Sequence, residues 1–99
     1  MTALAKCQAI VTLLVRTTQL HAQGKCSLGM IALAKAFASK EGREVVALCR
    51  EVCGGNGIIS NNRVMKHFMD MEAIHTYEGT YQINTLVAGR EYTGLPAFK

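Results

Sequence analysis

The sequence predicts an all-α fold, an antiparallel bundle of four helices joined by short connections. Alanine, leucine, methionine and glutamate, which favour helices, dominate the long segments, and the 99 residues include only one proline. Apolar residues recur at helical spacing, whereas few β-branched residues stand in the alternating runs typical of strands. A chain of this length forms at most one small domain, so residues 1–99 are assigned to a single domain.

The first predicted helix runs from about Thr2 to Gln23 and is terminated by Gly24. Its apolar stripe is expected to comprise Leu4, Val11, Leu14, Val15 and Thr18. No capping residue precedes this helix, and the stripe is already in phase at Leu4. We therefore expect the bundle to be truncated at its N-terminal end.

The second predicted helix begins at the N-cap residue Ser27, runs to about Cys53 and ends at the double glycine Gly54-Gly55. Gly42 interrupts it at some cost in helix stability relative to alanine. The apolar side of this helix is expected to comprise Met30, Ala34, Phe37, Ala38, Val45, Leu48, Cys49 and Val52.

Two shorter helices are predicted after a tight loop over residues 54–61. The third helix has about ten residues and is capped by Asn61 or Asn62. Its inward side chains are expected to be Val64, Met65, Phe68 and Met69.

A short connection over residues 73–77 leads to the fourth helix, which is predicted over about residues 78–91. Gly94 and Pro96 close it. Its buried side chains are expected to be Ile83, Leu86 and Val87.

The net charge of +4 does not by itself indicate a nucleic-acid partner. The eleven lysines and arginines are scattered from Lys6 to Lys99 without a dense block or an accompanying aromatic platform. No stretch approaches the ~18 apolar residues of a membrane span, and neither a signal peptide nor a peroxisomal SKL-type tail is recognisable. We therefore expect no nucleic acid and no membrane span. The expected location is the mitochondrial matrix in a eukaryote and the cytoplasm otherwise.

The cysteines are predicted to be reduced, buried thiols. They lack the close spacing of a disulfide scaffold, and they are Cys7, Cys26, Cys49 and Cys53. Cys49 and Cys53 are spaced to share a helix face, but His67 and His75 do not stand at a standard metal-ligand spacing. We therefore expect no metal site, and His75 is expected to be packed or half-exposed rather than catalytic.

The motif GGNG, residues 54–57, has two interpretations. Glycines let a backbone approach a ligand closely, and exposed N–H groups bind phosphate oxygens. Glycines also end helices and form turns, and on this motif alone the structural role is favoured.

The motif YEGT, residues 77–80, contains a single acid followed by glycine and threonine. A carboxylate at a helix N-terminus is stabilised by the dipole and by free N–H groups, which would make Glu78 a capping residue. In the other interpretation, Glu78 faces an apolar, water-poor pocket, where loss of hydration makes it a stronger base. Gly79 then leaves room for a ligand to approach.

The two motifs in this order, within GGNGII…MEAIHTYEGTYQINTLVAGREYTGLPAF, closely resemble the C-terminal end of the acyl-CoA dehydrogenases. The resemblance covers nearly the whole chain and is nearest to the glutaryl-CoA dehydrogenases and related short-chain acyl-CoA oxidases. The segment ALAKAFAS, residues 32–39, is similar to a small-residue helix of the family, and GREYTG, residues 89–94, looks like the tail of the glutaryl branch.

The resemblance implies a C-terminal helical domain that operates with an N-terminal helical domain and a middle β-domain, with FAD between domains and subunits. It implies that Glu78 is the catalytic base that removes the α-proton of an acyl-CoA thioester before hydride transfer to FAD. Gly79 matches a backbone contact to the substrate. The positions matching FAD contacts are Glu51, Val52, Cys53, Gly54, Gly55, Thr80, Gln82 and Phe98. Of these, residues 51–55 match a segment that touches the FAD of a neighbouring subunit.

The resemblance also implies a homotetramer and, for a dehydrogenase, an electron-transfer flavoprotein as partner. In the glutaryl branch, decarboxylation follows oxidation. The 99 residues hold neither the β-domain nor the N-terminal domain, so the isolated chain is expected to be inactive by itself. The alternative is a catalytically inactive, truncated bundle that serves as an oligomerisation or interaction module. The paired motifs disfavour a third possibility, a purely structural bundle.

Overall fold

The computed structural model of the chain describes residues 1–98, and these residues contain helices and no strands. The four α-helices are α1 (Thr2–Ala22), α2 (Leu28–Val52), α3 (Val64–Thr76) and α4 (Tyr81–Thr93). Two short 3₁₀ turns, η1 (Gly54–Ile58) and η2 (Ser60–Asn62), connect α2 to α3. The all-α prediction is confirmed.

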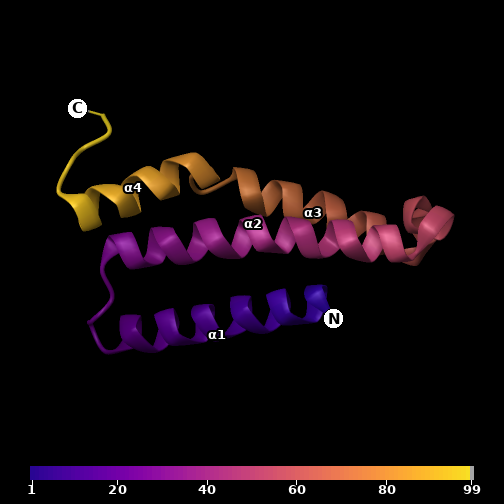
Figure 1. Cartoon of the computed structure of the whole chain (residues 1–99), viewed down its shortest axis with the longest axis horizontal. Coiled ribbons are helices and arrows are strands. Elements are labelled where there is room, and N and C mark those ends of the chain that lie inside the picture. The colour runs from indigo at the N-terminus through magenta and orange to yellow at the C-terminus, as the bar shows by residue number, and fades with distance from the viewer. Residues whose placement is uncertain (99) are drawn as a thin grey trace.

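The helices lie in one layer with α2 in the middle (Figure 1). α1 runs antiparallel to α2 on one side, and α3 and α4 follow one another end to end along the other side, also antiparallel to α2. Since α3 and α4 together fill one position, the four helices form a row of three rods rather than a closed bundle. The radius of gyration is 15.6 Å, above the value of about 13 Å for a compact chain of 100 residues.

The buried residues of this layer are small. They are Gly29, Ala32, Ala34, Ala36, Ser39, Gly57 and Ala88. Five of them lie in the first half of α2, where α1 and α4 pack against it. Small side chains let helix axes approach closely, so the contact rests on backbone proximity more than on large interlocking side chains.

The predicted apolar stripe of α1 is wrong, because all five of its residues are exposed, Leu4 at 65% and Val11 at 55% among them. The half-buried residues of α1 are Ala3, Lys6, Ile10, Leu13, Thr17 and Leu20. Their spacing is also helical, so α1 has two apolar faces. Periodicity alone does not reveal which of two such faces meets a neighbouring helix.

Other predicted core positions are only partly correct. Along α2, Ala34 is buried and four predicted residues are half-buried, whereas Phe37, Cys49 and Val52 are exposed. The predictions also fail at three positions of the shorter helices, where Met69, Ile83 and Leu86 are exposed. A single row of helices leaves both of its broad faces without a covering layer among residues 1–98, which explains these exposed side chains.

The helix ends follow the sequence more closely. Ser27 caps α2 as predicted, with its hydroxyl accepting a hydrogen bond from the Met30 N–H at 3.2 Å. Gly54, with φ +55°, and Gly94, with φ +72°, take the left-handed conformation just past α2 and α4. Arg63, not Asn61 or Asn62, occupies the position before α3.

The cysteine prediction is partly wrong. All four thiols are free, but Cys7 and Cys49 are exposed, and Cys26 and Cys53 are half-buried. Residues 1–98 bring no three histidines, cysteines or acids together in a way that could hold a metal ion. No helix in this part of the chain combines the length and the apolar character required to cross a membrane.

Candidate active site

The loop that carries Glu78, residues 77–80, joins α3 to α4 and is named here the Glu78 loop. The third helix continues to Thr76, past its predicted end, and the fourth begins at Tyr81 rather than near Glu78. Thr80 caps α4, with its hydroxyl oxygen 3.3 Å from the Ile83 N–H. The capping role considered for Glu78 is therefore wrong, because the threonine two residues later performs it.

Glu78 has an unusual backbone conformation. Its φ is +54° and that of Gly79 is +87°, so two consecutive residues are left-handed. For a residue with a Cβ this conformation costs about 1 kcal/mol or more. The Glu78 side chain is exposed, and its carboxylate makes no hydrogen bond or ion pair with another residue in 1–98. The chain thus holds a free acid on a strained backbone.

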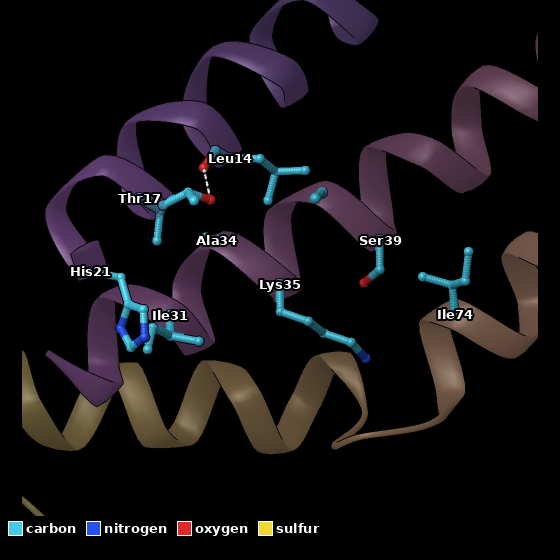
Figure 2. Close-up of a pocket in the computed structure, with 10 residues that line it drawn as sticks. Leu14, Thr17, His21, Ile31, Ala34, Lys35, Ser39 and Ile74 are labelled. Carbon is cyan, nitrogen blue, oxygen red and sulfur yellow. Dashed lines mark hydrogen bonds between the residues drawn. The ribbon is translucent and has the colours of Figure 1, made fainter. Parts of the chain in front are cut away.

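Residues 1–98 do not form the apolar pocket expected around Glu78. A groove of about 500 Å³ does lie nearby, over α2 between α1 and α3, but Glu78 does not line it (Figure 2). Leu14, Ile31 and Ile74 contribute its apolar walls, and Lys35 reaches from α2 across its edge.

Two side chains from outside the Glu78 loop hold it in place. The Lys35 ammonium donates to the carbonyl oxygens of Tyr77, at 2.8 Å, and Gly79, at 2.6 Å, with a longer contact of 3.4 Å to that of His75. The Asn84 side-chain amide donates to the carbonyl oxygens of Gly79, at 2.7 Å, and Thr80, at 3.1 Å.

Gly79 also packs closely. A Cβ at this position would lie 2.9 Å from the Asn84 amide nitrogen, and the positive φ adds strain for any larger residue. Neither the Glu78 nor the Gly79 N–H donates to a backbone acceptor within residues 1–98. Two free N–H groups therefore stand beside the free carboxylate.

His75 has a structural role in this arrangement. Its ring stacks on Tyr81 with centroids 6.2 Å apart, and its Nδ1 lies 3.3 Å from the hydroxyl of the buried Ser39. Burial lowers the pKa of His75, and the nearby positive charges of Arg43 and Lys35 lower it further. The histidine packs the end of α3 onto α2 in its neutral form.

The predicted FAD contacts fall into three separate places. Residues 51–55 lie at the C-terminal end of α2, about 24 Å along that helix from Lys35 and the Glu78 loop. Thr80 and Gln82 lie at the start of α4, where Gln82 is exposed. Phe98 lines a groove of about 500 Å³ at the other end of the layer, with Leu28 and Leu86. The chain does not bring these residues together in one pocket.

The glycines of GGNG differ in what the fold requires of them. Gly54 ends α2 through its positive φ, and a Cβ on Gly57 would lie 2.4 Å from the carbonyl oxygen of Arg50. Gly55 has neither a positive φ nor an atom within 4 Å of a built Cβ. The structural interpretation accounts for Gly54 and Gly57 but not for Gly55, and the backbone of both Gly54 and Gly55 is exposed.

One structurally important residue escaped the sequence analysis. Glu91, in the last turns of α4, accepts hydrogen bonds from the Ser27 hydroxyl and from the Gly29 N–H, the latter at 2.7 Å. It thereby satisfies a free N–H at the start of α2 and joins the two helices. The glycine two residues after the predicted N-cap was the available signal, because a Cβ on Gly29 would lie 2.6 Å from the Glu91 carboxyl carbon.

The sequence model of the family described as "Acyl-CoA dehydrogenase, C-terminal domain" matches residues 1–93. The chain belongs to this family. It is 31% identical over 86 residues to the cyclohexane-1-carbonyl-CoA dehydrogenase of Geobacter metallireducens, and the match covers 87% of the chain and 23% of that protein.

Among solved structures, this acyl-CoA dehydrogenase domain is similar to the glutaryl-CoA dehydrogenase from Mycobacterium smegmatis. The TM-score is 0.86 at 30% identity, over 90% of the chain and 23% of that structure. The resemblance identified from the sequence is thus confirmed at the level of family and fold. The chain spans less than a quarter of the length of either relative.

Proposed function

We propose that this domain supplies the catalytic base, Glu78, of a FAD-dependent oxidoreductase that acts on an acyl-CoA, with an activity like that of glutaryl-CoA dehydrogenase. The geometry of the Glu78 loop carries the proposal. An exposed carboxylate that has no partner among residues 1–98 stands on a left-handed backbone, and side chains of other elements hold the residues on both sides of it. Strained residues that the surrounding structure holds in place occur preferentially at active sites.

The chemistry follows from the groups at this loop. The Glu78 carboxylate is free to accept the α-proton of a bound thioester, because no lysine or arginine pairs with it in residues 1–98. The N–H groups of Glu78 and Gly79 are free to donate to the thioester oxygen, on which negative charge develops as the proton leaves. FAD supplies the hydride acceptor when it is bound.

The positions of the predicted FAD contacts fit a cofactor shared between copies of the protein. Gly54 and Gly55 follow the C-terminal end of α2, which lies about 24 Å along that helix from Lys35 and the loop that leads into Thr80 and Gln82. If two copies each contribute one group, both groups can contact the same FAD. The proposal therefore includes a homo-oligomer, with a tetramer as the expected state.

The test uses the holoprotein, meaning the FAD-loaded protein that contains this chain, either as a segment of a longer polypeptide or as a subunit. Glucose oxidase-catalysed removal of oxygen allows flavin bleaching to be followed after mixing with glutaryl-CoA or cyclohexane-1-carbonyl-CoA, the substrates named for the two relatives. Glu78→Gln should retain flavin and lose flavin reduction almost completely. Asp70→Asn removes an exposed carboxylate of α3 and serves as the matched control. Normal reduction in Glu78→Gln would remove Glu78 from the base role.

The electron acceptor separates a dehydrogenase from an oxidase. Reoxidation by an electron-transfer flavoprotein in preference to oxygen supports a dehydrogenase, and rapid reoxidation by oxygen supports an oxidase. Release of carbon dioxide from glutaryl-CoA tests whether decarboxylation follows the oxidation.

The exposed apolar face of α1 favours a second candidate, an interaction module without chemistry. Leu4, Val11, Leu14 and Val15 lie on this face and are between 41% and 65% exposed. Apolar area of this kind is typical of surfaces that another protein covers. This candidate predicts a chain that assembles with a protein partner, binds no flavin and is indifferent to Glu78→Gln.

A further inference from the structure

We propose that Lys35 is a positioning residue for Glu78. Its ammonium holds the backbone on both sides of the glutamate and thereby fixes where the carboxylate stands relative to α2. The structural part of this inference concerns the Glu78 loop alone, and its catalytic consequence rests on the proposed function of Glu78 as the base.

The contacts of Lys35 surround Glu78 along the chain. The ammonium lies 2.8 Å from the carbonyl oxygen of Tyr77 and 2.6 Å from that of Gly79, the residues immediately before and after Glu78. A third carbonyl oxygen, that of His75, is 3.4 Å away. An ammonium group has three donors and no acceptor, so these three carbonyls use all of its hydrogen bonds.

Lys35 therefore acts on the backbone and not on the carboxylate. No ion pair joins Lys35 to Glu78 within the described residues, and the three carbonyls leave no ammonium proton for one. A lysine that paired with Glu78 would weaken it as a base. A lysine that binds the flanking carbonyls positions the base and leaves its oxygens free.

The Glu78 loop has a specific need for a cation. The carbonyl oxygens at the end of α3 carry partial negative charge, which a cation stabilises. Glu78 and Gly79 are both left-handed, and a glutamate does not favour this conformation. Contacts from outside the loop must therefore maintain the backbone conformation of Glu78. The ammonium also lies 5.9 Å from the centre of the Tyr77 ring, within the range of a cation–π contact.

Asn84 cannot replace Lys35 in this role. Its amide binds the carbonyl oxygens of Gly79 and Thr80, but Asn84 belongs to α4, which the Glu78 loop itself leads into. Lys35 belongs to α2, the central helix, and its side chain extends from that helix towards the bend between α3 and α4 (Figure 2). Of the two, only Lys35 ties the base to the central helix of the layer.

Lys40 provides a matched control on the same helix. Its ammonium lies 5.7 Å from the centre of the Tyr81 ring, and it donates to no carbonyl oxygen of the Glu78 loop. Lys40→Met therefore removes the same charge from α2, near the same bend, without removing a hydrogen bond to the loop.

The experiment compares Lys35→Met, Lys35→Arg and Lys40→Met in the holoprotein. Anaerobic single-turnover flavin reduction is measured as a function of acyl-CoA concentration, with whichever of glutaryl-CoA and cyclohexane-1-carbonyl-CoA reduces the wild-type protein faster. Flavin content and acyl-CoA affinity are measured for each variant. Amide hydrogen exchange of a peptide covering residues 74–86 reports on the loop independently of activity, because the Tyr77 and Asn84 N–H groups on either side of it are hydrogen-bonded to the Ala73 and Thr80 carbonyl oxygens.

Lys35→Met should lower the limiting rate of flavin reduction by roughly 10- to 100-fold, because small displacements of a catalytic group have effects of this size. Acyl-CoA affinity and flavin content should change little, and exchange of the hydrogen-bonded amides that flank the loop should accelerate. Lys35→Arg should restore part of the rate, since a planar guanidinium reaches some of the carbonyls. Lys40→Met should match the wild type in every measurement.

A limiting rate in Lys35→Met equal to that of Lys40→Met, with flavin bound, overturns the proposal. So does a loss of acyl-CoA affinity at an unchanged limiting rate, which would make Lys35 a binding residue. If Lys35→Met does not retain flavin, Lys35→Gln, a shorter donor that cannot span the three carbonyls, takes its place under the same criteria. If Glu78→Gln keeps its activity, the assignment of Glu78 as the base is wrong. Separately, unchanged amide hydrogen exchange in Lys35→Met would show that Lys35 does not hold the Glu78 loop.

Discussion

The contact between Glu91 and the start of α2 gives a quantitative test of the fold. Glu91 accepts a hydrogen bond from the buried Gly29 N–H at 2.7 Å and another from the Ser27 hydroxyl, which itself caps Met30. Glu91→Ala leaves a buried N–H without a partner, at a cost of about 1–3 kcal/mol. The substitution also removes a negative charge from the N-terminus of α2, worth about 0.3–1 kcal/mol, and this loss is offset by relief of an unfavourable charge in the last turn of α4. We expect a loss of about 2 kcal/mol in the free energy of unfolding.

The assay is urea and thermal unfolding of the chain, followed by circular dichroism of its helices. A loss of about 2 kcal/mol in a domain of this size corresponds to a fall in Tm of roughly 10 °C. Glu51→Ala is the control, because Glu51 lies in the last turn of α2, where a negative charge is unfavourable. That variant should be neutral or slightly more stable than the wild type.

Gly29 offers a second check on the same contact. A Cβ on Gly29 would lie 2.6 Å from the Glu91 carboxyl carbon, so Gly29→Ala must displace the carboxylate. In the double variant with Glu91→Ala, the alanine at position 29 should lower the free energy of unfolding by less than it does alone.

Gly89→Ala should stabilise α4 by about 0.5–1 kcal/mol, because a Cβ built at this position meets nothing within 4 Å. Surface substitutions ordinarily change the free energy of unfolding by no more than about 0.5 kcal/mol. A change within this range for Glu91→Ala would refute the proposed capping of α2 by Glu91.

Two further outcomes follow from the structure. Gly57→Ala should destabilise the chain markedly, because its Cβ would lie 2.4 Å from the Arg50 carbonyl oxygen. Gly55→Ala should not, because a Cβ there meets nothing within 4 Å, and equal melting temperatures for the two variants would contradict this packing. Burial lowers the pKa of His75 in the folded chain, so the unfolded chain binds a proton at this residue more readily. The free energy of unfolding should therefore decrease as pH falls from about 6.5, the ordinary histidine value, through the lowered pKa of the folded chain. The hydrogen bond and charge pairing with Lys6 lower the pKa of Glu44, and this shift affects stability only below the ordinary value of 4.5. Urea unfolding measured between pH 5 and 7 therefore reports the contribution of His75 without that of Glu44. A pH dependence of stability in this interval that persists unchanged in His75→Phe would exclude His75 as its source.

The existence of the four helices, both ends of α2 and the end of α4 were predictable from local signals, whereas the cap of α3 and the boundary between α3 and α4 were not. The cap at Ser27 and the left-handed glycines at positions 54 and 94 depend on backbone geometry within a few residues, which sequence patterns describe well. The inward face of α1 was not predictable, because Leu13 and Leu14 belong to two apolar faces of similar quality. Which face meets α2 depends on the small residues of the partner helix, which no pattern within α1 records.

The candidate site shows the same division between local and distant information. The motif around Glu78 was identifiable through its resemblance to a family, but its backbone conformation depends on Lys35, 43 residues earlier in the chain, and on Asn84 in the next helix. The sequence does carry a signal at Lys35. It is a lysine within a run of buried and half-buried alanines, where a charge requires partners.

The small residues of α2 and the position of Glu78 are physically connected. Because Ala32, Ala36 and Ser39 let neighbouring helices approach α2 closely, the Lys35 side chain can reach from the surface of α2 to the backbone of the α3–α4 bend. Larger residues at these positions would push that bend away from α2 and break the contacts to the Tyr77 and Gly79 carbonyls. The small-residue core thus does more than stabilise the layer, since it brings the backbone on either side of Glu78 within hydrogen-bonding reach of the central helix.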